Sequence, residues 1–355
     1  MGKAMENWES YVRKVVPYVP GEQPRQENII KLNTNENPYP PAPGVLRALH
    51  DMNVGKLRKY PDPTCKILVD AIAENYGLKS SQVFVGVGSD DVLAMIYLTF
   101  FNSEKPILFP DITYSFYDVW ADMLRIPYEV KPLDNNFRII KEDYYGSNGG
   151  VIFPNPNAPT GIFMELSEVE DLISHNRAVI VVVDEAYIDF GGASALPLID
   201  KYDNLIVVQT FSKSRSMAGM RIGYAMGNEK LIRYLNDVKY SFNSYTMNET
   251  ALVLGTEAMK DKAYFEETCR KIIHTREWTK EELRKLGFSF GDSMSNFIFA
   301  EHESVPAKEL FEALKKAGIY VRYFNKPRID NFLRISIGTD EEMCELVKFL
   351  KEYIK

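Results

Sequence analysis

The chain has 355 residues, of which 45% are hydrophobic and 26% are charged. This length predicts about two or three domains rather than one small module. The composition is typical of a globular protein and excludes a disordered, collagen-like or disulfide-rich chain. The 49 acidic residues outnumber the 42 basic residues, giving a net charge of −7, and neither sign forms a long run. We therefore expect no nucleic-acid partner.

The sequence pattern also argues against a membrane or secreted protein. The longest apolar stretch, residues 178–183, is far shorter than the roughly 20 residues of a membrane helix. The first eight residues carry an acid where a signal peptide has an apolar core. These features predict a cytoplasmic protein with no membrane partner.

The cysteines and histidines are few and scattered. Cys65, Cys269 and Cys344 form no close pair, so we expect neither a disulfide framework nor a zinc site. The four histidines have no spacing that would predict a metal site or a Ser/His/Asp arrangement. We therefore expect no metal, and a cofactor or another kind of side chain should carry any chemistry.

The chain opens with a segment rich in proline and asparagine. Prolines at the density of residues 17–41 disfavour helix, so we expect an extended N-terminal arm over residues 1–40 that docks on a domain. Apolar residues at helical spacing then predict short helices over residues 43–51 and 65–76, the second of which ends at Gly77.

Strands and helices alternate in the next part of the chain. Short β-branched and aromatic runs predict strands over residues 83–87, 106–109, 128–131, 150–153, 179–183 and 205–209. A helix is expected after the first strand, over residues 92–101. This alternation predicts an α/β domain over residues 41–247, with a mainly parallel central sheet covered by helices on both faces.

Longer and more charged helices follow Met247. They are expected over residues 250–286, with a break near 259–262, and over residues 306–317 and 340–353. Short strands are expected between them, over residues 296–300, 320–322 and 332–336. The change in character predicts a smaller C-terminal α+β domain over residues 248–355.

Polar residues follow several of the predicted strands, and ligands of open α/β sheets lie outside the carboxyl ends of the strands. The first strand leads to Gly88-Ser-Asp-Asp91 at a helix start, where backbone amides and the helix dipole favour an anion such as phosphate. The strand over 179–183 leads to Asp184. The strand after it leads to Lys213, which Arg221 follows eight residues later.

Each of these features alone has an ordinary structural explanation, such as a turn, a solvated strand end or a surface charge. Together they match the needs of pyridoxal phosphate, which are a lysine for covalent attachment, an acid for the pyridine nitrogen and donors for the phosphate. The combination therefore predicts a pyridoxal-phosphate site.

The chain resembles the fold-type I pyridoxal-phosphate-dependent aminotransferases over nearly its whole length, and most closely the histidinol-phosphate aminotransferases. The motifs that carry the resemblance are Asn35-Glu-Asn-Pro-Tyr39, Arg58-Lys-Tyr-Pro-Asp62, Gly88-Ser-Asp-Asp91, Pro110-Asp-Ile-Thr-Tyr114, Asn155-Pro-Asn-Ala-Pro-Thr-Gly161, Asp184-Glu-Ala-Tyr187, Ser212-Lys213 with Arg221, Val321-Arg-Tyr-Phe324 and Leu333-Arg-Ile-Ser-Ile-Gly338.

The resemblance implies roles for residues around the cofactor. Lys213 would carry the cofactor covalently and move the proton of the substrate, and Asp184 would keep the pyridine nitrogen protonated. Tyr187 would bond to the ring oxygen O3′, and Tyr114 would stack on the ring. The cofactor phosphate would accept hydrogen bonds from the backbone amides of Ser89 and Asp90 at the helix start, and Thr210, Ser212 and Arg221 would bind it as well.

One position departs from the family pattern. Where many relatives have two asparagines before Pro-Thr-Gly, this chain has Asn157 followed by Ala158. The bond to O3′ is therefore expected either from Asn157 in a shifted position or from Tyr187 alone.

The resemblance also implies residues that bind the substrate. Arg334 and Arg322 would bind its carboxylate or phosphate. Tyr18 and Tyr60 would line the phosphate end, and Asn35 belongs to the same substrate-binding set. In the family the position of Tyr60 reaches the active site of the neighbouring subunit, which implies a homodimer with shared active sites.

The activity implied by the resemblance is reversible transamination between L-histidinol phosphate and 2-oxoglutarate, which gives imidazole acetol phosphate and L-glutamate in histidine biosynthesis. An aromatic amino acid aminotransferase and a threonine-phosphate decarboxylase remain alternatives, because they share most of these motifs. The segments 321–324 and 333–338 favour the transaminase.

Two readings from other classes are weaker. Gly86-Val-Gly88 suggests a dinucleotide-binding dehydrogenase, but the third glycine of that fingerprint and the acid about 20 residues further on are missing. A pyridoxal-phosphate-binding regulator would need a DNA-binding module, for which the chain has no spare residues. We therefore expect an enzyme.

Overall fold

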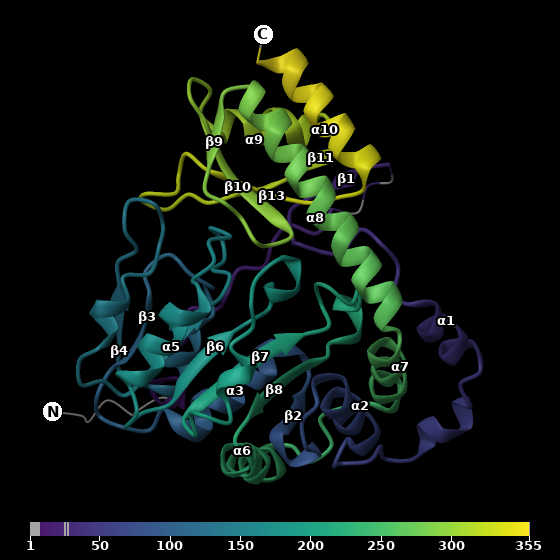
Figure 1. Ribbon diagram of the computed structural model, residues 1–355, viewed down its shortest axis with the longest axis vertical. Coiled ribbons are helices and arrows are strands. Elements are labelled where there is room, and N and C mark those ends of the chain that lie inside the picture. Colours follow the sequence, from purple (N-terminus) through teal and green to yellow (C-terminus); the bar gives the residue numbers. More distant parts are fainter. Residues whose placement is uncertain (1–7, 25, 27, 355) are drawn as a thin grey trace, which may run out of the picture.

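A computed structural model describes residues 8–24, 26 and 28–354 of the chain. Figure 1 shows two units, a larger one around a seven-stranded sheet and a smaller one, above it in this view, around a four-stranded sheet. Residues 1–7, 25 and 27 of the predicted arm lie outside the described residues.

The larger sheet is mainly parallel, as predicted. Its strand order is β2-β8-β7-β6-β5-β3-β4, and within it only β8 runs antiparallel to its neighbours. The strands are β2 (Val83–Gly86), β3 (Ile107–Pro110), β4 (Tyr128–Lys131), β5 (Gly150–Pro154), β6 (Val181–Asp184), β7 (Leu205–Thr210) and β8 (Gly223–Gly227). The six strands expected from the sequence all exist, with ends within two residues of the expected ones.

Strand β8 is the member of this sheet that the sequence does not predict. It has glycine at both ends, which weakens the strand pattern. The structure explains Gly223, because a Cβ there would lie 2.2 Å from the backbone nitrogen of Ser89. The close approach of β8 to the start of helix α3 (Gly88–Phe100) therefore requires glycine, and this requirement hides the strand from a sequence reading.

The central strand β6 is buried on both faces, as predicted. Val181 and Val183 pack in the hydrophobic core on one face of the sheet, and Val182 packs in the core on the other face. Helices α2, α5 and α7 contribute to the first core, and α3, α4 and α6 contribute to the second. The helices of the larger unit besides α3 are α1 (Pro43–His50), α2 (Lys66–Tyr76), α4 (Tyr117–Leu124), α5 (Leu166–Ser174), α6 (Glu229–Phe242) and α7 (Glu249–Lys260).

The smaller unit has the α+β character expected from the sequence. Its antiparallel sheet has the order β12-β13-β10-β9. Its strands are β9 (Phe288–Phe290), β10 (Phe297–His302), β12 (Arg322–Tyr323) and β13 (Leu333–Ser336), and its helices are α8 (Lys262–Lys285), α9 (Ala307–Lys316) and α10 (Asp340–Tyr353).

The strand expected over residues 320–322 is divided between two sheets. Strand β11 (Ile319–Tyr320) pairs in parallel with β1 (Ile30–Lys31) of the arm, whereas β12 belongs to the four-stranded sheet. Val321 between them and Leu32 of the arm are both buried in the core of the smaller unit. The prediction that the arm docks on a domain is therefore confirmed.

The long helical segment is interrupted where the sequence predicts a break. Helix α7 ends at Lys260 and α8 begins at Lys262, and the side chain of Asp261 accepts a hydrogen bond from the backbone nitrogen of Tyr264. Helix α7 packs against α1 and α2 of the larger unit, whereas α8 packs against α10. The helical segment therefore packs on the larger unit before Asp261 and on α10 of the smaller unit after it. The domain boundary between residues 247 and 248 stays a prediction.

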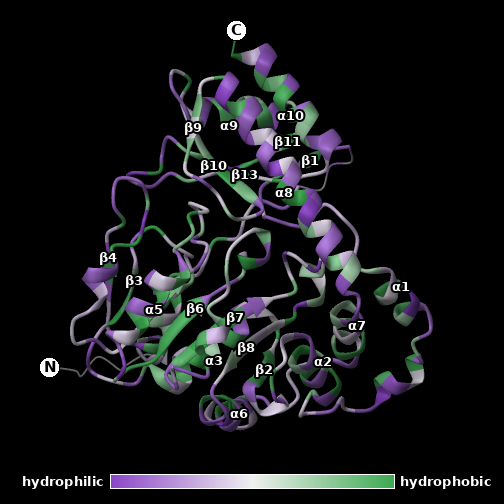
Figure 2. Cartoon of the chain, viewed as in Figure 1, coloured by the Kyte–Doolittle hydropathy of each residue, from purple (hydrophilic) through white to green (hydrophobic). Residues whose placement is uncertain are grey.

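Figure 2 shows apolar residues gathered on the strands of the larger sheet, and polar residues that alternate with apolar ones along α8 and α10. Helix α8 has 24 residues but is mostly charged and polar. In the part of the chain that the structure describes, no helix combines the length and the apolarity needed to cross a membrane.

We predict that Leu32→Ala destabilises the protein by about 2–5 kcal/mol, because the side chain is 1% exposed and its loss leaves a cavity in the core of the smaller unit. Val16→Ala is the matched control in the same arm, because Val16 is 83% exposed and its truncation should change stability by less than about 0.5 kcal/mol. Urea unfolding measures both changes. Equal effects of the two substitutions would show that the arm does not belong to the core.

Candidate active site

Two adjoining cavities lie at the carboxyl ends of the strands of the larger sheet. The inner cavity has a volume of about 240 Å³ and the outer cavity a volume of about 260 Å³. Thr34, Tyr114, Ala158, Tyr187 and Lys213 border both cavities. A ligand in either cavity therefore meets these five residues.

Most of the predicted site residues border these cavities. The inner cavity is bordered by Ser89, Asp90, Tyr114, Asp184, Tyr187, Thr210, Ser212, Lys213 and Arg221. The outer cavity is bordered by Tyr18, Asn35, Tyr114, Tyr187, Lys213, Arg322 and Arg334. Asn157 and Tyr60 are the predicted residues that border neither cavity.

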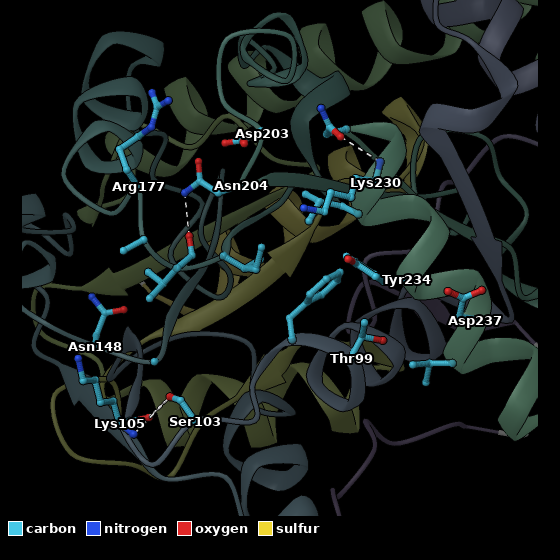
Figure 3. A pocket seen from close by; sticks show the side chains of 18 of the residues that line it. Thr99, Ser103, Lys105, Asn148, Arg177, Asp203, Asn204, Lys230, Tyr234 and Asp237 are labelled. Carbon is cyan, nitrogen blue, oxygen red and sulfur yellow. Dashed lines mark hydrogen bonds between the residues drawn. The ribbon is translucent and has the colours of Figure 1, made fainter.

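A larger hollow, of about 1290 Å³, lies at the opposite edge of the sheet (Figure 3). It is bordered by Gly149, Ile180 and Asn204, which come directly before strands β5, β6 and β7. This is the edge at which ligands of open α/β sheets do not bind. The two smaller cavities therefore form the candidate site.

The inner cavity has an anion-binding end at the start of α3. Gly88 has a φ of +84°, and a Cβ there would lie 2.5 Å from Nη2 of Arg221, so glycine lets the arginine lie over the helix start. Arg221 forms an ion pair of 3.0 Å with Asp90. The hydroxyls of Thr210 and Ser212 border the same cavity and bond to each other at 3.0 Å. Helix amides, hydroxyls and a guanidinium together suit a phosphate group.

Asp184 ends strand β6 and is buried. Its Oδ2 accepts a hydrogen bond of 3.0 Å from the hydroxyl of Tyr117, and its Oδ1 accepts one of 3.2 Å from the backbone nitrogen of Ala186. Burial raises the pKa of Asp184 to about 6, although both hydrogen bonds lower it, and the charge of Asp90 adds to the rise. No ion pair to Asp184 forms among the described residues. The carboxylate therefore suits a cationic nitrogen of a ligand ring.

The next acid, Glu185, points away from the cavity. It accepts hydrogen bonds from the hydroxyl of Ser194 at 2.6 Å, the backbone nitrogen of Ala195 at 2.6 Å and the amide of Gln209 at 2.8 Å. Burial raises its pKa to about 7. Because successive side chains of an extended segment point to opposite sides, only Asp184 of this pair borders the cavity.

Lys213 lies between the two cavities. Its Nζ donates a hydrogen bond of 3.1 Å to the backbone oxygen of Thr34 and lies 5.6 Å from the ring centre of Tyr187. The amide of Asn37 donates to the backbone oxygens of Lys213 and Ser214, at 3.1 and 3.2 Å. The arm thus contacts both the amine and the backbone of this lysine.

Two tyrosines border both cavities. The hydroxyl of Tyr187 accepts a hydrogen bond of 2.9 Å from the amide of Asn35, so its own proton is free to be donated to a ligand. The hydroxyl of Tyr114 donates at 2.6 Å to Asp90, and burial together with that charge raises the pKa of Tyr114 well above its usual value. Both side chains are therefore held by polar partners at the edge of the site.

The side chain of Asn157 lies behind the cavities. Its amide nitrogen donates to the backbone oxygen of Ile112 and to the hydroxyl of Thr160, both at 3.0 Å, and its amide oxygen accepts from Thr113 at 3.2 Å. Ala158 borders the cavities instead. Both polar atoms of the Asn157 side chain are therefore bonded within the protein, to Thr160 of its own loop and to the segment that follows β3.

The outer cavity contains two arginines. Arg334 donates from Nη2 to the backbone oxygen of Asn33 at 3.1 Å, while its Nε is buried without a hydrogen-bond partner among the described residues. Burial lowers the pKa of Arg334, and the charge of Arg322 lowers it further. Tyr18 borders the same cavity, with its ring stacked at 4.2 Å on Phe116. A buried guanidinium with an unpaired donor favours an anionic ligand.

Tyr60 lies apart from the cavities of its own chain. Its side chain is 82% exposed, and its ring lies 4.7 Å from that of Tyr245. The structure therefore places Tyr60 at the surface, outside both cavities.

Sequence reasoning misses three residues of the site. Thr34 and Glu36 border the inner cavity. Glu36 belongs to the motif Asn35-Glu-Asn-Pro-Tyr39 and Thr34 directly precedes it, so the motif could have indicated both residues. Tyr117 bonds to Asp184 from helix α4, a contact that only the folded chain reveals.

Comparison with known proteins places this site in a family. The family model "Aminotransferase class I and II" matches residues 27–350. The chain belongs to that family. It is 52% identical to the histidinol-phosphate aminotransferase of Clostridium acetobutylicum, over 98% of this chain and 99% of that protein. It is 50% identical to the histidinol-phosphate aminotransferase of Lactococcus lactis subsp. cremoris MG1363, over 98% of each.

A solved structure has the same fold. The histidinol-phosphate aminotransferase of Sinorhizobium meliloti, in complex with pyridoxal-5′-phosphate, aligns with a TM-score of 0.84 at 24% identity. The alignment covers 92% of this chain and 90% of that one. The prediction of a fold-type I aminotransferase is confirmed.

We predict that Asp184→Asn stabilises the protein without ligand at pH 8. The pKa of Asp184 rises from 3.8 to about 6 on folding, so the folded state binds the proton more tightly and stability falls as pH rises through this range. Asparagine removes that penalty, which amounts to about 3 kcal/mol above pH 6. Urea unfolding at pH 8 and pH 5 should show a larger gain at pH 8. An equal gain at both values would contradict the burial of an ionised carboxylate.

Proposed function

We propose that the protein is a pyridoxal-phosphate-dependent aminotransferase that exchanges an amino group between L-histidinol phosphate and 2-oxoglutarate, forming imidazole acetol phosphate and L-glutamate in histidine biosynthesis. The observation that carries the proposal is the identity of about half of all residues, over whole lengths, to relatives named for this activity. We keep the cytoplasm as the proposed location.

The inner cavity fits pyridoxal phosphate by the chemistry of its donors. Ser89 at the start of α3, the hydroxyls of Thr210 and Ser212 and the guanidinium of Arg221 would hold the phosphate. The buried carboxylate of Asp184 has no cation of its own and would bind the protonated pyridine nitrogen. We assign the bond to O3′ to Tyr187, because the amide of Asn157 already has partners on both of its polar atoms.

The side chains of the site then have separate tasks. Pyridoxal phosphate, when bound, supplies an electron sink for negative charge at the substrate Cα. The amine of Lys213 would anchor the cofactor. Once released, it would take the proton from Cα of the amino donor and, in the second half of the reaction, return a proton to Cα of the amino acceptor. Asp184 would hold the proton on the ring nitrogen throughout, and Tyr187 would orient the ring. Tyr114 would cover one face of the ring.

The outer cavity supports a doubly charged anionic group on the substrate. Arg334 offers a buried and unpaired Nε, and Arg322 borders the same cavity. A phosphate accepts hydrogen bonds from both guanidinium groups and from the hydroxyl of Tyr18. The α-carboxylate of glutamate would occupy the position of the phosphate in the other half of the reaction. These contacts favour histidinol phosphate over an aromatic amino acid, which offers a single carboxylate.

A homodimer belongs to the proposal. Tyr60 is exposed and remote from the cavities of its own chain, as expected of a residue that completes the site of a partner. Other exposed apolar side chains of the same region are Leu46, Leu49, Val54, Leu57, Phe242 and Tyr245. An apolar surface of this kind supports a stable interface between two copies.

We predict that kcat/KM for histidinol phosphate exceeds that for phenylalanine, tyrosine or unphosphorylated histidinol by at least about 100-fold, because a ligand without phosphate leaves buried donors unpaired. Arg334→Ala should reduce this ratio of kcat/KM values and should also weaken the binding of glutamate. Steady-state assays with each amino donor measure the ratio. Comparable rates with phenylalanine would indicate an aromatic aminotransferase, and release of carbon dioxide from threonine phosphate would indicate the decarboxylase.

We predict that an inactive Lys213→Ala chain and a weakened Tyr60→Phe chain restore activity when they are mixed. In a mixed dimer with shared sites, one site combines an intact Lys213 with an intact Tyr60, so an equal mixture should recover about a quarter of the wild-type activity. Assays after joint refolding measure the recovery. If Tyr60 served the site of its own chain, mixing would restore nothing.

A further inference from the structure

Glu36 is an acidic side chain of the inner cavity that the chemistry described above does not use. It lies on the arm between β1 and α1, and its side chain is 42% exposed. Its Oε2 accepts a hydrogen bond of 2.6 Å from the hydroxyl of Thr34 and pairs with the ammonium group of Lys31. In the part of the chain that the structure describes, its Oε1 has no hydrogen-bond partner.

Each oxygen of the other two carboxylates that border the cavities already accepts a hydrogen bond or forms an ion pair within the protein, and Asp184 is assigned to the cofactor. Asp184 is buried at the strand end, where it accepts bonds from Tyr117 and Ala186. Asp90 accepts from Tyr114 and pairs with Arg221. Glu36 is therefore the carboxylate with an acceptor atom open to a substrate.

The position of Glu36 relative to the lysine suggests which part of a substrate it meets. Thr34 connects them, because its backbone oxygen accepts from Nζ of Lys213 and its hydroxyl donates to Glu36. Arg322 and Arg334 border the outer cavity, to which Glu36 does not contribute. With the cofactor in the inner cavity, a substrate joined to it beside Lys213 and bound through its anionic group by the arginines would have its third substituent within reach of Glu36, which Thr34 connects to Lys213.

We propose that Glu36 selects the amino donor by accepting a hydrogen bond from the ring N–H of its imidazole group, with Lys31 as the counter-charge that lets the same position tolerate the side-chain carboxylate of glutamate. This inference rests on the proposed function. An imidazole ring presents an N–H donor, and a carboxylate is a strong acceptor for it. A phenyl ring of similar size offers no donor and would leave Oε1 without a partner.

The ion pair with Lys31 makes the site suitable for both substrates in turn. A lone carboxylate would repel the side-chain carboxylate of glutamate, whereas a carboxylate paired with an ammonium group has no net charge. Substitution of Glu36 should then impair the use of histidinol phosphate but not that of glutamate, and substitution of Lys31 should impair the use of glutamate more. A residue that only fixed the arm would affect both half-reactions alike.

The test compares L-histidinol phosphate with L-phenylalaninol phosphate, which carry the same phosphate and amino groups and differ in the ring. We expect the holoenzyme to favour histidinol phosphate, and Glu36→Gln to lower the ratio of the two kcat/KM values by about tenfold or more. Glu36→Asp, which keeps the charge, should retain part of the preference. Calorimetric binding of both compounds to the cofactor-loaded Lys213→Ala protein should show the same change without turnover.

The second part of the test measures the KM for glutamate in variants of Lys31 and Glu36. Lys31→Gln should raise the KM for glutamate more than that for histidinol phosphate, and Glu36→Gln should not raise it. Glu22→Gln is the control, because it removes a different ion pair of the arm, with Lys315 at 2.7 Å, outside both cavities. It should leave the ratio unchanged.

Two results would overturn the proposal. One is an unchanged ring preference in both Glu36→Gln and Glu36→Asp. The other is an equal loss for both ring compounds and glutamate, which would show a structural role for Glu36. A wild-type enzyme that fails to use histidinol phosphate at all would instead refute the proposed function.

Discussion

The burial of the Asp184 carboxylate at the end of a central strand is the constraint on which the site depends. An acid with a pKa raised to about 6 by burial is destabilising in the empty protein, and Tyr117 and Ala186 compensate it only in part. A cationic ring nitrogen in the cavity would relieve this cost. The same carboxylate that weakens the folded chain would therefore favour binding of the cofactor, which would set stability against function at this position.

The anion-binding end depends on a second constraint, the close packing of β8 on the start of α3. Gly223 brings the backbone of β8 against Ser89, and Gly88 leaves space for Arg221 over the helix start. A side chain at either glycine would separate the guanidinium from the helix amides. Two of the segments proposed to bind the phosphate, at residues 88–89 and 221–223, therefore lie together because β8 packs on the start of α3.

The sequence predicts the parts of this structure that are encoded locally. Apolar runs identify six of the seven strands of the larger sheet, and the polar residues at or shortly after the strand ends include Asp184 and Lys213, which both border the inner cavity. Long-range contacts are not encoded in this way. The strand expected over residues 320–322 is divided because its first part pairs with the distant arm. Asn157 suits a polar contact by type, yet the folded loop uses all of its polar atoms.

The arm connects the smaller unit to Lys213, the proposed catalytic lysine. The backbone of Asn35 bonds to Ser336 and Asn296 of the smaller unit, while its amide reaches Tyr187 in the larger one. Two residues further on, Asn37 holds the backbone of Lys213. The segment from Asn35 to Asn37 is therefore attached both to strand β13, which carries Arg334, and to Tyr187 and Lys213 of the larger unit. The arm thus links the position of Arg334 to that of Lys213, the two side chains that would hold the anionic group and the amino group of a substrate.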